Sequence, residues 1–239
     1  MSVVSFSDTV FVLHARAFQE TSLVIECLGV EQGRFSCLAR SARKLGRGNK
    51  RSELQMTAQI NVMCRGKGEL KTLTESETLK AAVSLTGDKY AVACYVSEVA
   101  MRILQPQSPC PDVYNKIEQI YQDLHVGSVN QVNLRLFELS LLDELGEGVD
   151  FQFDMNGESI DPNLYYDFRQ QSGFEINNLQ QKRNSIKGDE LLKIADHQWD
   201  EFSLAVLKQL TRRLLASHLG EKPLKSRELW RQWEKNKIR

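Results

Sequence analysis

Apolar and polar positions alternate along much of the first 80 residues, which is the pattern of β-strands with one buried face. In the segment 34–39, for example, Phe35 and Cys37 fall on one face, and the residues between them fall on the other. The Glu31-Gln32-Gly33 turn predicts a hairpin. The strands expected from the pattern are 10–16, 22–28, 34–39, 54–64 and 70–74. Five short strands with glycine turns are typical of a small barrel, and a five-stranded OB-type barrel is the best-known architecture of that size.

Helical periodicity replaces this alternation after Glu77. The segment 88–104 is apolar on nearly all faces, so we expect it to be a buried helix. The expected helices are 88–104, 113–124, 132–145, 188–195, 201–219 and a short final helix with Ser226 as its N-cap. The buried stripe of the helix 201–219 is expected to contain Phe202, Val206, Leu210, Leu214 and Leu215.

The two patterns together predict an α+β chain with more than one domain. Residues 1–80 are expected to form the OB-type β-barrel, and residues 81–239 an all-α helical domain. Residues 149–187 follow neither periodicity and are rich in acidic and aromatic side chains. We expect them to form an irregular insertion in the helical domain.

The charges are segregated along the chain, although its 31 basic and 31 acidic side chains make it formally neutral. Residues 34–51 contain seven Lys or Arg and no carboxylate, whereas residues 138–167 contain nine carboxylates and no Lys or Arg. Residues 206–239 contain ten basic and three acidic side chains. A single zone of this kind is often only a solvated face, but three alternating zones favour a functional surface field.

The first basic zone connects the third and fourth expected strands and lacks apolar periodicity, which predicts a solvated loop. A phosphate backbone is the simplest ligand for such a loop, and the sparse aromatic residues predict little sequence preference. Its basic residues are Arg34, Arg40, Arg43, Lys44, Arg47, Lys50 and Arg51. The C-terminal zone would either extend this DNA-binding surface or form the polar faces of surface helices, through Lys208, Arg212, Arg213, Lys225, Arg227 and Arg231.

Composition and motifs argue against several classes of protein. No apolar run approaches the roughly 20 residues that span a bilayer, and no secretory signal is evident at the N-terminus. Five widely spaced cysteines without a C-x-x-C pair predict free thiols in a reducing cytosol. The four histidines are scattered, and we find no nucleotide-binding or nucleophile motif. We therefore expect a cytoplasmic protein with no catalytic residues, metal, cofactor or membrane partner.

Blocks of sequence in a fixed order cover nearly the whole chain. They read VFVLHARAFQETSLVIECLGVEQGRFSCLARSARK, then GELKTLTESE, then LRLFELSLLDELGEGVDF, and finally KPLKSRELWRQW. Together these blocks resemble the RecO family of DNA recombination and repair mediators. The resemblance implies an N-terminal OB domain, a helical remainder and no catalytic turnover.

The resemblance also implies a function and a set of partners. RecO-like proteins bind single- and double-stranded DNA, anneal complementary strands and, with RecR, help load RecA onto DNA coated by single-strand binding protein (SSB). A nucleoid-associated location follows from this role. These proteins also bind the acidic and apolar C-terminal tail of SSB, which requires an apolar groove beside a cation. Arg135 and Leu139 are our candidates for that site, and the alternative is that Arg135 faces solvent or pairs with Glu138 or with the neighbourhood of Asp143.

One feature departs from the family pattern. Many RecO-like proteins carry a four-cysteine zinc site in the segment that corresponds to residues 149–187, but no cysteine follows Cys110 in this chain. We therefore predict that the segment holds no structural zinc. Its order is expected to come from aromatic residues or from packing on the helices.

Two other classes of function remain open on the sequence. The charged zones would suit a protein-interaction adaptor that makes no direct contact with DNA. A nuclease would instead use the acidic zone 138–167 to hold Mg²⁺, although the spacing of these carboxylates gives no compact ligand set. Our main hypothesis is that the first basic zone neutralises the phosphates of two strands, so that complementary bases can meet.

Overall fold

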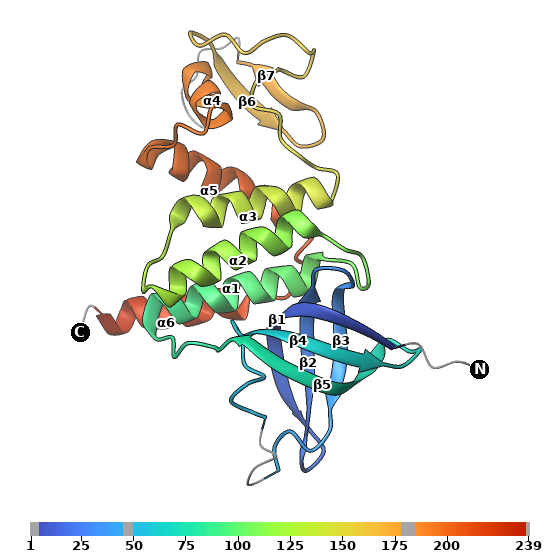
Figure 1. Ribbon diagram of the computed structural model, residues 1–239. Helices are drawn as coiled ribbons and strands as arrows, with labels where there is room; N and C mark the ends of the chain where they lie inside the picture. The colour runs from blue at the N-terminus through green and yellow to red at the C-terminus, as the bar shows by residue number, and fades with distance from the viewer. Residues whose placement is uncertain (1–4, 45–49, 178–184, 238–239) are drawn as a thin grey trace. The chain divides into compact units, whose positions relative to one another are not determined.

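The computed structural model describes residues 5–44, 50–177 and 185–237, and the chain forms two compact units. The first unit contains Met1–Val129 and Glu221–Arg239, and the second contains Asn130–Gly220. The C-terminal helix therefore belongs with the N-terminal barrel, although the second unit separates them in the sequence. Figure 1 shows the elements of both units.

A closed barrel of five strands forms the N-terminal part of the first unit, as predicted. Strand β1 (Ser5–Phe18) pairs with β2 (Ser22–Gly29) and with β4 (Gln59–Arg65), while β3 (Gly33–Ala39) pairs with β2. Strand β5 (Leu70–Lys80) closes the barrel by pairing antiparallel with β4 and parallel with β3. This order gives a five-stranded barrel of the OB type.

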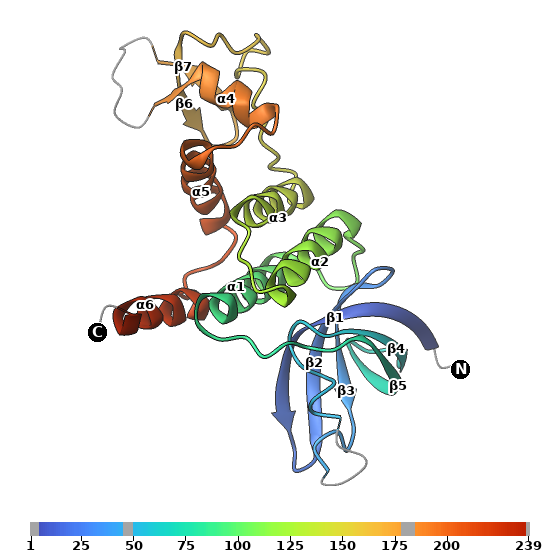
Figure 2. The ribbon, with the colours of Figure 1, turned by 60° about the vertical axis from the view of Figure 1, so that its left-hand side comes forward.

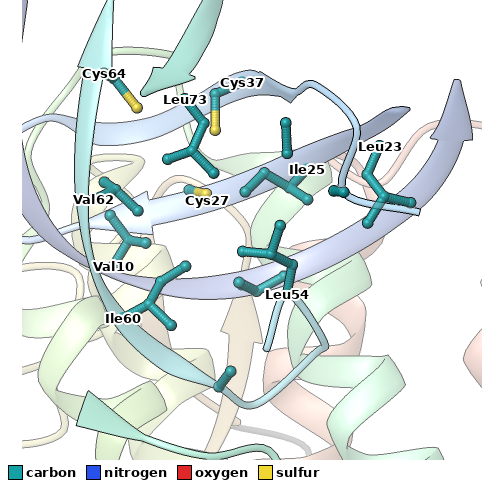
Figure 3. Close-up of a cluster of buried hydrophobic side chains, with 14 of the residues drawn as sticks. Val10, Leu23, Ile25, Cys27, Cys37, Leu54, Ile60, Val62, Cys64 and Leu73 are labelled. Carbon is teal, nitrogen blue, oxygen red and sulfur yellow. The ribbon is translucent and has the colours of Figure 1, made fainter. Parts of the chain in front are cut away.

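Alternate residues of the strands fill the barrel interior, as the period of a half-buried strand requires. Figure 3 shows Val10, Ile25, Ile60 and Val62 converging from different strands, and each is at most 1% exposed. Strand β4 begins at Gln59 and not at residue 54 as expected, because residues 50–58 form turns. Leu54 is nevertheless 1% exposed, because it points into the same core.

Two helices pack against the barrel within the first unit: α1 (Gly87–Ile103) and α2 (Pro111–His125). The Phe11 ring of β1 lies 5.0 Å from the Tyr114 ring and 5.3 Å from the Tyr121 ring of α2. The Gln59 side-chain amide donates a hydrogen bond of 3.1 Å to the Tyr114 hydroxyl. Burial raises the pKa of Tyr114 to about 12, so this hydroxyl stays protonated in the contact.

The beginning of β3 is joined to the end of α1. Gly33 has a φ of +62°, and a Cβ at this position would collide with the Ser108 carbonyl, so only glycine allows this close approach. The neighbouring Arg34 carbonyl accepts a 2.8 Å hydrogen bond from the Gln107 backbone N–H. The segment between α1 and α2 is therefore fixed to the hairpin between β2 and β3.

Helix α6 (Lys225–Lys237) packs along α1. The Glu98 carboxylate of α1 accepts hydrogen bonds from the backbone N–H groups of Lys225 and Ser226, at 3.1 and 2.9 Å. Ser226 lies inside the helix and donates its own hydroxyl to Glu98, so the prediction that Ser226 is the N-cap is wrong. A carboxylate from another helix satisfies these N–H groups instead.

The helices of the second unit are α3 (Gln131–Glu144), α4 (Gly188–Ala195) and α5 (Glu201–Ala216), and α3 packs against α5. Asp200 caps α5 by accepting a 2.9 Å hydrogen bond from the Ser203 N–H. The Ser203 hydroxyl donates in turn to Glu190 of α4, which directs Ser203 into the unit. Phe202 is consequently 60% exposed, so its predicted place in the buried stripe is wrong.

The segment 149–187 contains a three-stranded antiparallel sheet with the order β7-β6-β8. The strands are β6 (Tyr165–Arg169), β7 (Gly173–Ile176) and β8 (Ile186–Lys187). The buried Phe174 ring lies 5.8 Å from Phe151 and 5.2 Å from Phe168, and the Tyr166 hydroxyl accepts from the Asp161 N–H at 2.8 Å. Aromatic packing therefore orders this segment. No helix in the described part of the chain has the length and apolarity needed to cross a bilayer.

Candidate nucleic-acid interface

One backbone hydrogen bond fixes the basic segment after β3 to one end of the barrel, and a second closes the segment on itself. The Arg43 backbone N–H donates to the Thr21 carbonyl at 2.8 Å, and the Lys50 N–H donates to the buried Ala42 at 3.0 Å. The first bond joins the segment to the turn between β1 and β2, and the second brings its two halves together. Figure 2 shows the end of the barrel at which this segment lies.

Several basic side chains of the segment point to solvent. Arg40, Lys44 and Arg51 are exposed, and Arg43 is partly exposed with a 3.4 Å hydrogen bond to the Gln19 carbonyl. The Lys50 ammonium donates to the Ser76 hydroxyl at 2.8 Å. We refer to the surface that carries these side chains as the basic end, and its described residues are Arg40, Arg43, Lys44, Lys50 and Arg51. Arg47 lies outside the described residues.

Arg16 adds a further positive charge that the sequence analysis missed. It lies close to the end of β1, opposite Val24 in the register with β2, and it is exposed. Because Arg16 lies among apolar residues in the sequence, the pattern did not indicate that its side chain is exposed. Glu20 and Glu53 lie in the adjoining turns, and Glu75 and Glu77 flank Ser76, the partner of Lys50, so four carboxylates lie near six basic side chains when Arg16 is included.

Arg34 lies at the other end of β3 from Arg40, so the structure does not bring it together with the basic end. Its Nε donates to the Leu104 carbonyl at 2.9 Å, and its Nη1 lies 3.7 Å from Glu26. Only 19% of its side chain is exposed. Arg34 therefore joins the barrel to the end of α1, and DNA binding by Arg34 stays a prediction.

The basic residues of the C-terminal zone are divided between the two units. Lys208, Arg212 and Arg213 are exposed on α5 in the second unit, where the Arg213 guanidinium also lies 5.2 Å from the centre of the Phe168 ring. Lys225 and Arg227 belong to the first turn of α6 in the first unit. Their role in DNA binding stays a prediction.

The site predicted for the SSB tail is occupied by a buried ion pair. Arg135 is only 5% exposed, and its Nη2 lies 2.9 Å from Glu138, one turn further along α3. The Thr211 hydroxyl of α5 donates to the same carboxylate. The alternative of pairing with Glu138 is thus the arrangement observed, while Leu139 is partly buried. Tail binding at Arg135 and Leu139 stays a prediction.

Three thiols lie in the barrel core, where Figure 3 shows Cys27 of β2, Cys37 of β3 and Cys64 of β4. A hydrogen bond with Cys27 raises the pKa of Cys37, and a hydrogen bond with Cys37 raises that of Cys64, in both cases together with burial. The Cys37 and Cys64 thiols are therefore neutral and unsuited to nucleophilic chemistry.

The acidic zone does not form a compact ligand set in the described residues, where no group of three or more His, Cys, Asp or Glu could hold a metal ion. Several of its carboxylates have structural partners, as Glu138 and Asp154 illustrate. Glu138 binds Arg135, and Asp154 accepts from the backbone N–H groups of Asn156 and Glu158, at 2.8 and 3.0 Å.

Comparison with known proteins gives one consistent family. Residues 1–82 match the family model described as Recombination protein O N terminal, and residues 84–228 match Recombination protein O C terminal. DNA repair protein RecO of Aliivibrio salmonicida is 36% identical over 222 residues, which cover 92% of this chain and 93% of the relative. DNA repair protein RecO of Vibrio cholerae is 34% identical over 224 residues, covering 93% of this chain and 92% of the relative.

Proposed function

Because this chain belongs to the RecO family of DNA repair proteins, we propose that it is a recombination mediator that binds DNA at the basic end of its barrel. It binds single- and double-stranded DNA in this proposal and anneals complementary strands without catalytic turnover. With RecR, it helps to load RecA onto single-stranded DNA coated by SSB. Association with the nucleoid follows from the same activity.

The anchoring of the basic segment is the observation that carries this proposal. The bond from Arg43 to Thr21 and the bond from Lys50 to Ala42 fix the backbone near the barrel, while the side chains of Arg40 and Lys44 stay in solvent. Such an arrangement brings exposed cations together at one end of the barrel. Lys and Arg in this arrangement bind the phosphate backbone and release its counterions.

The same surface accounts for annealing. Two single strands repel each other through their phosphates, and a surface that neutralises both lowers this repulsion. Contacts to the phosphates leave the base edges free, because they carry no sequence information themselves. Complementary bases on the two strands can then meet and pair.

The salt dependence of binding tests this role of the basic end. We expect the variant Arg40→Ala/Arg43→Ala/Lys44→Ala/Arg47→Ala to bind single-stranded DNA more weakly than the wild type. Each phosphate contact contributes about −0.7 to the slope of log K against log salt, so the slope flattens by up to about 2.8. Fluorescence anisotropy of a labelled oligonucleotide across a salt series measures both quantities.

A control variant removes charge from a different part of the barrel. Arg65→Ala/Lys67→Ala changes two exposed residues at the turn between β4 and β5, and it should leave the slope close to that of the wild type. An unchanged slope in the basic-end variant would exclude this surface as the binding site. Failure of the wild-type protein to bind DNA at all would favour the adaptor, and cleavage of DNA in Mg²⁺ would favour the nuclease.

Binding of the SSB tail belongs to the same proposal, but it needs a separate test. The Arg135 guanidinium already faces Glu138, so a tail carboxylate at this site would compete with Glu138 for the same cation. Titration of a tail peptide into folded Arg135→Lys protein should show weaker binding than the wild type, because lysine lacks the bidentate geometry of arginine. Wild-type affinity in this variant would dismiss the site.

A further inference from the structure

A groove of about 610 Å³ lies beside the basic end in the first unit. Its walls come from β1 and β2, from the end of the basic segment, from the linker 83–85 and from the first turns of α1. This volume falls within the range of about 300–1,000 Å³ that is typical of sites for small molecules. The linker and α1 come after the barrel in the sequence, so the groove exists only once the first unit has folded.

The floor of the groove is apolar, and its rim is basic. Leu23 and Leu54 line it and belong also to the barrel core, where Figure 3 labels both. Arg43 and Arg51 line it as well, and no Asp or Glu is among its lining residues in the described part of the chain. An occupant that combines an anionic group with a flat apolar part would complement both features.

Tyr90 gives the groove an aromatic wall. It lies in the first turn of α1, lines the groove and is 43% exposed. Gln55 and Ser84 add side chains that can donate or accept hydrogen bonds. An aromatic ring close to cations is the arrangement by which proteins bind the bases of a single strand.

We propose that this groove takes one unstacked nucleotide of a single strand whose backbone lies on the basic end. Tyr90 packs against the base, and Arg43 and Arg51 contact the neighbouring phosphates. This inference rests on the proposed function, because it assumes that the basic end binds DNA. It adds a contact that requires a base to be present but does not depend on which base it is, since every base has a π-face.

The groove would make the protein distinguish single strands from duplexes. A single strand can place a base in the groove at little cost, whereas a duplex must first unpair and unstack one. Contacts from Arg40 and Lys44 to phosphates serve both forms of DNA. Tyr90 should therefore matter for single strands alone.

Anisotropy measurements on three probes test this inference with the full chain. The probes are a single-stranded oligothymidine, an oligonucleotide of the same length with abasic sites in place of the bases, and a duplex. We expect Tyr90→Ala to weaken binding of the oligothymidine by about 5-fold or more, as loss of a stacking residue does. Binding of the abasic strand and of the duplex should stay unchanged, and so should the salt slope, because Tyr90 carries no charge.

Two further variants separate stacking from structural effects. Tyr90→Phe keeps the ring and should bind like the wild type. Phe202→Ala removes an aromatic residue that is 60% exposed in the second unit, and it should also bind like the wild type. Equal loss of affinity for all three probes in Tyr90→Ala, or wild-type affinity for the oligothymidine, would overturn the groove as a base site.

Cys94 provides an independent probe, because it lines the groove and is partly exposed while the other four cysteines are buried. Oligothymidine should slow its labelling by a maleimide, and the abasic strand should slow it less. Protection by an acidic, apolar peptide but not by oligothymidine would make the groove a peptide site and would overturn the inference. A wild-type protein that bound none of the three probes would instead refute the proposed function itself.

Discussion

Arg135 illustrates how a single residue can differ from its expected role. In the sequence it is one cation among the leucines of a helix, and a cation beside an apolar row suggests a site for a carboxylate ligand. In the structure it is 5% exposed, and Glu138, three residues later, provides the carboxylate. Helical spacing makes such a pair possible, but only the packing of α5, with Thr211 donating to Glu138, explains its burial.

This burial predicts an asymmetric response to substitution. Arg135→Met leaves the Glu138 carboxylate buried without its cation, and it should lower the free energy of unfolding by about 3–5 kcal/mol. The double variant Arg135→Met/Glu138→Leu removes both charges and should be more stable than Arg135→Met alone. Urea unfolding followed by circular dichroism measures both values. A double variant less stable than the single one would show that the ion pair does not determine the stability here.

At the scale of the elements, α6 shows what a pattern along the chain does not reveal. Helical periodicity predicts the helix, yet its N-terminal N–H groups are bound by Glu98, which lies in another helix. Arg102 reinforces the contact, because it pairs with Glu98 at 2.6 Å and donates to the carbonyl of Pro223 just before α6. Gly87, with a φ of +61°, leaves room for Trp233, since a Cβ there would lie 2.8 Å from the indole nitrogen.

The docking of α6 should depend on pH through Glu98. Burial by itself would raise the pKa of Glu98, but hydrogen bonds from Ser226 and Lys225 and the charge of Arg102 lower it below its ordinary value of 4.5. A carboxyl group with a lower pKa in the folded state stabilises that state above about pH 4.5, and this stability is lost as the pH falls through the folded pKa. Glu98→Gln should therefore destabilise the protein at pH 7, by about 1–3 kcal/mol.

Tryptophan fluorescence during urea unfolding at pH 7 and at pH 3 follows this effect, because Trp230 and Trp233 lie on α6. The difference between wild type and Glu98→Gln should be present at pH 7 and should shrink at pH 3. Glu228→Gln, which changes an exposed carboxylate in the first turn of α6, serves as the control and should match the wild type at both values. A difference of equal size at both pH values would contradict the role given to the Glu98 charge.

At the scale of the whole molecule, the sequence predicts the elements better than it predicts their grouping. Apolar runs and alternation identified all five strands of the barrel, and helical periodicity with end signals identified all six described helices, because these patterns are local. The sequence did not reveal that the chain returns to its first unit at Glu221, because this grouping depends on contacts between segments that are distant in the sequence. The sheet in residues 149–187 was missed because its strands have five, four and two residues, which is too short to show a clear period.

The candidate site likewise has one part that the sequence predicts and another that it does not. The basic segment is visible in the sequence as a run of charge, and its place between β3 and β4 follows from the strand pattern. The groove is not visible, because Tyr90 and Arg43 belong to elements that only the folded unit brings together. Arg34 belongs to the charged run but not to the basic end, because β3 separates it from Arg40.

The rate at which the protein anneals two complementary strands tests the central claim most directly. The measurement uses labelled oligonucleotides over a salt series between about 50 and 200 mM, the range in which phosphate contacts change affinity most strongly. The account predicts that the wild type accelerates annealing, that salt suppresses the acceleration, and that the variant Arg40→Ala/Arg43→Ala/Lys44→Ala/Arg47→Ala loses most of it while Arg65→Ala/Lys67→Ala retains it. Wild-type annealing by the basic-end variant would contradict the claim that this end of the barrel brings the strands together.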